Sequence, residues 1–258
     1  MAPNRRRRPG AEDVGVADEP TEAELDECPF CEGREDRTPP ETFRVGGLAG
    51  WLVRVVPNLY PAFERQEVVV HSPRHVRTFA ELTDDEISAV AEAWQARRTA
   101  ARLEGFAYVH ALINEGRAAG SSLPHSHSQL VWLREAPPVV TEEQADAVPE
   151  LLAESRLRVA ELGDLVAVAH RAGRLPYETL IGGEPFDLGA GLRLLRDVVR
   201  RLRALEGPVP WNAWLHDGER PHLELVPRLA VQAGVELGAG IAVNTVAPED
   251  AAAALRSV

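Results

Sequence analysis

Two histidines and a glutamine alternate with serines near the middle of the chain. His125, His127 and Gln129 occur in the segment HSHSQ, directly before the apolar run LVWL. Side chains two residues apart point to the same face of a β-strand, so these three polar groups would share one surface. An imidazole on such a surface can attack a phosphorus atom and carry a group covalently. A single strand histidine is more typical of a structural residue, but the alternating pattern favours a functional face.

A loop rich in glycine and serine precedes this segment. Its relevant members are Gly116, Gly120, Ser121 and Ser122. Glycine lets backbone N–H groups approach an anion without obstruction by a Cβ atom, and serine adds hydroxyl donors. The pattern predicts a phosphate-binding loop beside the histidines, although it is also typical of a plain turn between two strands.

The chain contains two cysteines, Cys28 and Cys31, in the segment CPFC. The Cys-x-x-Cys spacing allows two thiolates to bind one zinc ion, and a tetrahedral site needs two further ligands. His75 and His125 are the candidates, which would give a Cys2His2 site. A thioredoxin-like redox pair is the alternative. We favour the metal because CPFC lies in a Pro- and Glu-rich segment before the first predicted strand.

These two sites together indicate a reaction type. If His125 binds the metal, His127 stays free on the same face and can act as a nucleophile. The competing chemistry is hydrolysis by metal-bound water, which needs an open coordination position. Four protein ligands leave none, so the metal is expected to stabilise the strand.

The elements that position these residues can be predicted from hydrophobic periodicity. Strands are expected at 51–58, 66–73, 108–114 and 127–133, and a helix at 83–105 with a Thr83–Glu86 capping box. A loop-dominated stretch is expected at 9–42, a linker at 135–149 and a further helix through about residue 162. The second half repeats the pattern, with strands at 164–173, 176–183, 210–217 and 221–228 and a helix at 191–207. This predicts an α+β fold of two similar halves, 1–140 and 141–258, on antiparallel sheets with packed helices.

Composition limits the partners. Of 258 residues, 40 are acidic and 28 are Lys or Arg, for a formal charge of -12, which argues against a nucleic-acid surface. The one basic cluster, at 5–8, reads from composition alone as a solvated tail. No apolar run approaches the length of a membrane span, and the start MAPNRRRRPG lacks the apolar stretch of a signal peptide. We therefore expect a cytoplasmic protein without membrane or nucleic-acid partners.

Taken in order, several motifs resemble one family. They are APNRRRRP, CPFC, VPNLYPA, HSPRH, NEGRAAGSSLPHSHSQ, PYETLI, PHLELVPR and AGVELGAGIAVN. This set resembles the galactose-1-phosphate uridylyltransferase family of the histidine-triad superfamily, including its relatives of the ADP-glucose phosphorylase type. The resemblance implies two histidine-triad-like halves, a homodimer, and ping-pong transfer of a nucleotidyl group between a nucleotide sugar and a hexose 1-phosphate.

The resemblance also implies roles for individual residues. His127 would be the nucleophile, and Gln129 would steady the phosphoryl oxygens. The implied zinc ligands are Cys28, Cys31, His75 and His125. The implied nucleotide, phosphate and hexose contacts are Asn58, Leu59, Tyr60, Asn114, Gly120, Ser121, Ser122 and Glu236. Arg5 and Arg8 match arginines that meet the phosphates, which would make them ligands and would reverse the reading of a solvated tail.

The implied activity is transfer of UMP between a UDP-hexose and a hexose 1-phosphate, as in galactose metabolism. Adenylyl transfer to inorganic phosphate is the nearest alternative, and a histidine-triad nucleotide hydrolase is another. A zinc-stabilised nucleotide-binding module is the non-enzymatic alternative. The second half keeps only His222 and Glu224 of a further metal motif common in the family, so a second metal site is not expected.

Overall fold

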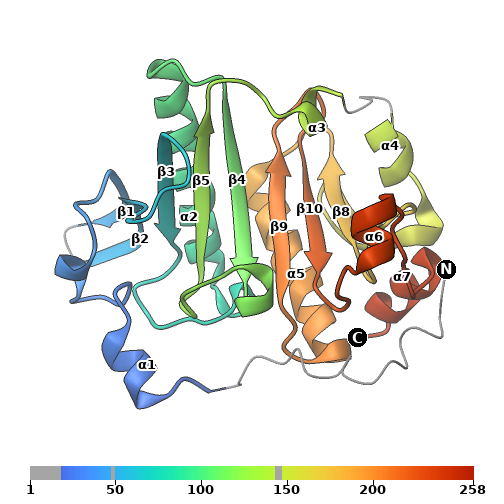
Figure 1. The fold of residues 1–258 in the computed structure, drawn as a ribbon, viewed down its shortest axis with the longest axis horizontal. Helices are drawn as coiled ribbons and strands as arrows, with labels where there is room; N and C mark the ends of the chain where they lie inside the picture. The colour runs from blue at the N-terminus through green and yellow to red at the C-terminus, as the bar shows by residue number, and fades with distance from the viewer. Residues whose placement is uncertain (1–18, 48–49, 143–146) are drawn as a thin grey trace.

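Ten strands form one sheet in the computed structural model, which describes residues 19–47, 50–142 and 147–258 (Figure 1). The strands of the first half are β1 (Phe43–Gly47), β2 (Gly50–Pro57), β3 (Arg65–Val70), β4 (Tyr108–Glu115) and β5 (His127–Leu133). Those of the second half are β6 (Arg158–Leu162), β7 (Leu165–Ala169), β8 (Thr179–Gly183), β9 (Trp211–His216) and β10 (His222–Pro227). Every neighbouring pair is antiparallel. The predicted α+β class with antiparallel strands and packed helices is confirmed.

The two halves meet in the middle of the sheet. The strand order is β1-β2-β3-β5-β4-β9-β10-β8-β7-β6, so β4 of the first half pairs with β9 of the second. In this pair Leu112 lies opposite Trp214, and Asn114 lies opposite Asn212. Main-chain hydrogen bonds therefore continue across the seam, and the predicted division at residue 140 falls between β5 and β6.

The two longest helices cover one face of the sheet. The helices of the described residues are α1 (Glu22–Glu27), α2 (Asp84–Leu103), α3 (Pro138–Thr141), α4 (Ala147–Leu152), α5 (Leu188–Glu206), α6 (Gly234–Ala239) and α7 (Pro248–Arg256). The long helices α2 and α5 pack against each other and against the strands behind them in Figure 1. The side chains of Ile87, Val90 and Trp94 on α2 are fully buried, and each contributes about 1.5 to 3 kcal/mol by its removal from water. Among the described residues, no helix is both long and apolar enough to cross a bilayer.

The opposite face of the central strands carries the polar residues. Ser128 of β5 points to the helices, because its hydroxyl accepts a hydrogen bond from the Trp94 indole at 2.9 Å. His127 and Gln129 therefore project to the other face. In Figure 1 the near face of β4 and β5 lies clear of the described helices. The alternation in HSHSQ thus follows the two sides of the sheet, as predicted.

Two predictions of secondary structure are wrong. The helix expected through about residue 162 ends at Leu152, and residues 158–162 form β6, which pairs with β7. The segment RVAEL is rich in helix formers, but pairing across the tight turn at Gly163, where φ is 59°, overrides that propensity. The expected loop at 9–42 contains α1 within its described part, and β1 follows it without having been predicted.

Candidate active site and metal centre

His127 is the first residue of β5, in register with Val70 of β3. Its Nδ1 lies 2.7 Å from the carbonyl oxygen of His125, and because a carbonyl can only accept, the proton sits on Nδ1. Burial lowers the pKa of His127 below its ordinary value, although the bond to the His125 carbonyl opposes this effect. The Phe30 ring packs edge-on against the imidazole at a centroid distance of 5.5 Å. The imidazole is therefore neutral and held in one orientation, and its Nε2 carries the lone pair.

Gln129 has a fixed orientation on the same face. Its Oε1 accepts a hydrogen bond of 2.6 Å from the side-chain amide of Gln66, on the neighbouring strand β3. This contact leaves the NH2 group of Gln129 as a donor. Gln66 was not singled out in the sequence, although it is the first residue of the strand predicted at 66–73; its position beside Gln129 depends on the pairing of β3 with β5.

Cys28, Cys31, His75 and His125 form one cluster. Their ligand atoms all lie within 4.8 Å of one another, which is the arrangement of a metal site. The Cys28 Sγ is 3.3 Å from the His125 Nδ1, and the Cys31 Sγ is 3.4 Å from the His75 Nδ1. Sulfur and nitrogen ligands on one tetrahedral ion are about 3.6 Å apart at ordinary bond lengths. The four residues thus fit a tetrahedral metal.

The ionisation of the cluster also suits a metal. Burial, followed by the hydrogen bond and charge of Cys28, raises the pKa of Cys31 to about 12. Burial lowers the pKa of His125 to about 4, so this imidazole is neutral and can donate its lone pair. A cation would favour the thiolate that burial opposes. Its binding would therefore release protons from the cysteines.

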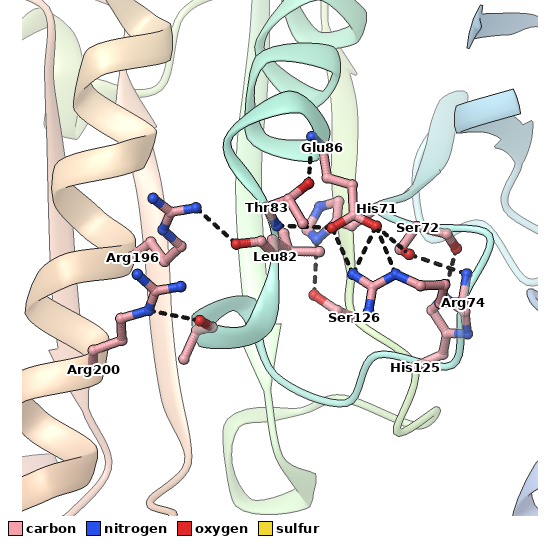
Figure 2. A network of polar contacts seen from close by, with 11 residues as sticks. His71, Ser72, Arg74, Leu82, Thr83, Glu86, His125, Ser126, Arg196 and Arg200 are labelled. Atoms are coloured by element: carbon pink, nitrogen blue, oxygen red, sulfur yellow. Dashed lines mark hydrogen bonds and ion pairs between the residues drawn. The ribbon is translucent and has the colours of Figure 1, made fainter.

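A polar network behind the cluster fixes His125 (Figure 2). The Nε2 of His125 lies 3.0 Å from the carbonyl oxygen of Ser72. The Ser72 hydroxyl donates to the Glu86 carboxylate at 2.6 Å, and Arg74 donates to both carboxylate oxygens at 2.8 and 2.9 Å. Glu86 also accepts the Thr83 backbone N–H as part of the cap of α2. The helix that packs the core therefore also holds a histidine of the candidate metal cluster.

The carboxylate at the centre of this network is ionised. Burial alone would favour the protonated form of Glu86, but hydrogen bonds from Ser72, Thr83 and Arg74 lower its pKa. The capping box identified in the sequence thus has a second role as the anchor of the His75 loop. This role could not be predicted from the sequence, because Ser72 and Arg74 lie in the loop after β3, well before α2 begins at Asp84.

A cavity of about 500 Å³ opens beside His127. Of the predicted residues it is lined by Asn114, Ser121, Ser122, His125 and His127. The predicted phosphate-binding loop therefore lies beside His127 and His125 in one cavity.

Two asparagines hold the predicted phosphate-binding loop in place. Asn212 of β9 donates to the Asn114 side chain at 2.8 Å and to the carbonyl oxygen of Ala119 at 2.7 Å. The Ser121 hydroxyl donates to the Leu123 carbonyl at 2.8 Å, so it is engaged inside the loop. Ser122 is exposed, and no hydrogen bond within the described ranges occupies its hydroxyl. Ser122 is therefore the loop hydroxyl available to a ligand.

Other predicted contacts lie away from this cavity. Asn58, Leu59 and Tyr60 form an exposed turn after β2, in which Asn58 Oδ1 accepts the Tyr60 N–H at 2.9 Å. The antiparallel register puts this turn near the C-terminal end of β5, whereas His127 is the first residue of that strand. Glu236 lies on α6 over the second half, where its carboxylate caps its own helix through the Ala233 N–H. Gly120 adopts a left-handed conformation with φ of 92° in the loop but does not line the cavity.

Arg5 and Arg8 lie outside the described residues. The cavity has further lining side chains that the sequence did not reveal, among them Glu24, Arg77, Thr78, Glu115, Arg117 and Arg203. Arg203 comes from the last turn of α5, far from the loop in sequence, so its presence depends on how α5 packs under the sheet.

Comparisons with known proteins agree with the motifs. The sequence model of the family described as galactose-1-phosphate uridyl transferase, N-terminal domain, matches residues 61–138. An ADP-glucose phosphorylase from Arabidopsis thaliana is 27% identical over an alignment of 294 positions, gaps included. The alignment covers 90% of this chain and 82% of that protein.

Solved structures give the same picture. The crystal structure of an ADP-glucose phosphorylase from Arabidopsis thaliana with bound ADP-glucose is 28% identical, with a TM-score of 0.85 and coverage of 100% of this chain and 94% of that one. A GalT-like protein from the same plant is 28% identical, with a TM-score of 0.81 and coverage of 90% and 92%. A uridylyltransferase structure at 23% identity shares the fold, with a TM-score of 0.77 and coverage of 95% and 93%. Residues 61–138 of this chain thus match the galactose-1-phosphate uridyl transferase family, and the chain is similar in sequence and fold to ADP-glucose phosphorylase, as its motifs predict.

Proposed function

We propose that this protein transfers a nucleoside monophosphate from a nucleotide sugar to a phosphate acceptor through a covalent intermediate on His127. The observation that carries the proposal is the state of this imidazole: neutral, protonated on Nδ1, and next to a cavity that also contains the glycine-serine loop. No hydrogen bond from the described part of the chain occupies its Nε2. This nitrogen is the atom that a nucleophilic histidine needs.

The transfer has two halves. In the first, the Nε2 lone pair attacks the α-phosphorus, the bond to the leaving phosphate oxygen breaks, and that oxygen keeps the electron pair as hexose 1-phosphate departs. In the second, an oxygen of the acceptor phosphate attacks the same phosphorus, and Nε2 recovers its lone pair. The NH2 group of Gln129 and the donors at Ser122 would stabilise the phosphoryl oxygens in both steps.

We infer that the group carried is adenylyl, with inorganic phosphate as acceptor. The support is the similarity to ADP-glucose phosphorylase over 90% of this chain and the TM-score of 0.85 to the structure with bound ADP-glucose. Uridylyl transfer between a UDP-hexose and a hexose 1-phosphate, the activity implied by the motifs, is the second candidate. The match of residues 61–138 to the uridyl transferase family favours it.

We further propose that the cluster of Cys28, Cys31, His75 and His125 binds zinc. Zinc would cross-link CPFC, the loop after β3 and the residue two before His127, and so fix the start of β5. A cytoplasmic location and a homodimer complete the proposal.

The test is to detect the intermediate. The protein would be incubated with ADP-glucose and, separately, with UDP-glucose, without any acceptor, and its intact mass would be measured under alkaline conditions, where phosphoramidates persist. An AMP adduct supports the adenylyl form, and a UMP adduct supports the uridylyl form. His127→Ala should form neither. His110→Ala is the matched control, because His110 lies on β4 on the same face of the sheet, and this variant should still form the adduct.

A further inference from the structure

Two arginines in the cavity have no role in the motifs. Arg117 lies in the short turn η4 (Arg117–Ala119), and Arg203 lies in the last turn of α5. Both line the cavity that contains His127. Neither guanidinium makes a hydrogen bond or a salt bridge within 4 Å with another residue of the described ranges, and Arg203 has a longer-range electrostatic attraction to Glu115. Two arginines without a direct partner in one cavity are unusual, because arginines in a cavity normally have partners.

The carboxylates of the same cavity do not neutralise these cations. Glu24 is already bound by Arg77, with the Nε of that arginine 2.9 Å from Oε1. Glu115 accepts hydrogen bonds from the Thr78 hydroxyl at 2.6 Å and from a backbone N–H. Burial raises the pKa of Glu115, which favours its neutral form, although these bonds and the charge of Arg203 oppose the shift. Glu81 is exposed on the rim. Positive charge therefore remains available at Arg117 and Arg203.

The backbone that carries Arg117 is held rigidly. Gly116 has φ of 84°, and a Cβ added there would lie 3.0 Å from the Pro210 Cβ, so the loop packs directly on the segment before β9. The Ser121 N–H bonds back to the Gly116 carbonyl at 3.2 Å. Asn212 holds the other end of the turn, as described above. A cation on such a loop is positioned before any ligand binds, which lowers the entropy cost of binding.

We propose that Arg117 and Arg203 bind the phosphate group of the acceptor, either inorganic phosphate or a hexose 1-phosphate, next to His127. A phosphate dianion suits two guanidinium groups, which donate paired hydrogen bonds to its oxygens. The proposal rests on the proposed function and adds the site from which the acceptor oxygen attacks. When that oxygen bonds to the phosphorus, the Nε2–P bond breaks and no further reactant is needed.

The first experiment measures binding without catalysis. Calorimetric titrations of the full-length protein would use inorganic phosphate and, separately, glucose 1-phosphate, with glucose as the uncharged control. The variants are Arg117→Gln, Arg203→Gln and, as matched control, Arg102→Gln, because Arg102 lies at the far end of α2 beside Asp217. Loss of a charge-assisted hydrogen bond should weaken phosphate binding at least about tenfold in each cavity variant and leave the control unchanged. Arg203→Lys keeps the charge and should restore part of the affinity if Arg203→Gln misfolds.

The second experiment measures the acceptor concentration that half-saturates removal of the nucleotidyl group from the preformed adduct. It should rise at least about tenfold in Arg117→Gln and Arg203→Gln. Tighter binding of glucose 1-phosphate than of phosphate would identify the hexose phosphate as the acceptor. Equal binding by cavity variants and control, or no phosphate binding by the unaltered protein, would overturn the inference. Absence of any adduct would instead refute the proposed function, while the titrations would still decide the role of the arginines.

Discussion

The Glu24 carboxylate lies 2.9 Å from the Nε2 of His75, whose Nδ1 faces the sulfur of Cys31. Glu24 is a residue of α1, a short helix capped by the Thr21 hydroxyl. A carboxylate on the outer nitrogen of a metal-bound histidine fixes the ring and increases its basicity. The helix at the start of the described chain therefore supports the candidate metal centre.

Replacement of Glu24 should weaken the metal site. We expect Glu24→Gln to lower the metal affinity about 10- to 100-fold, because the amide keeps the contact but loses the charge. Competition with a chromophoric chelator measures this affinity. Glu22→Gln is the control, since Glu22 is an exposed residue on the same helix. Equal affinities for the two variants would show that the carboxylate has no such role.

Metal binding and catalysis should separate by mutation. His127→Ala should retain about one metal ion per chain, because His127 is not a ligand in this arrangement. Cys28→Ser should lose the ion and melt at a lower temperature, since a ligand that fixes the start of β5 is removed. Elemental analysis and thermal unfolding of both variants test this. Loss of metal in His127→Ala would reverse the assigned roles of the two histidines.

The loop glycine next to the cavity should be irreplaceable. At Gly116, φ of 84° and ψ of 152° define a region that is essentially restricted to glycine. Gly116→Ala adds a contact with Pro210 to this strain, so we expect a loss of about 2 to 4 kcal/mol in the free energy of unfolding. Gly163→Ala is the control: φ is 59° there, but no atom lies within 4 Å of the added Cβ, and about 1 to 2 kcal/mol is expected. Urea unfolding that ranks the two variants equally would contradict the packing argument.

Acid should destabilise the second half of the sheet through His216. Burial, together with the charge of His222, lowers the pKa of His216 to about 4. The folded state thus holds a neutral imidazole whose pKa is near 6.5 when unfolded. Its contribution is complete above pH 6.5 and is lost as the pH falls toward 4, because the unfolded chain then binds the extra proton. His216→Gln should show a smaller fall in unfolding free energy between pH 7 and pH 5 than the unaltered protein; an identical fall would exclude His216 as the cause.

The sequence revealed the parts of the site that depend on local spacing. The strand face of His125, His127 and Gln129 follows from period-two alternation, and the metal cluster follows from CPFC with two histidines. Alternation fixes which side chains share a face, and a four-ligand metal restricts the choice of partners. These features can be predicted without knowledge of the tertiary fold.

Features that depend on distant packing could not be predicted. Arg203 enters the cavity because the last turn of α5 ends beside it, and nothing near Arg203 in the sequence marks it. β6 was taken for a helix because its alanine, glutamate and leucine have high helix propensity, whereas pairing with β7 decides its conformation. Such outcomes are set by contacts between segments that are far apart along the chain.

The pairing of β4 with β9 joins two halves that contribute differently to the candidate site. The proposed nucleophile, the proposed metal ligands and the loop all come from the first half, but Asn212 and Pro210 of the second half contact that loop and support it. A fragment that ended after β5 would keep every reactive atom and lose the surface on which its loop rests. The second half thus supports the loop beside His127, and the chemistry proposed for the first half depends on that support.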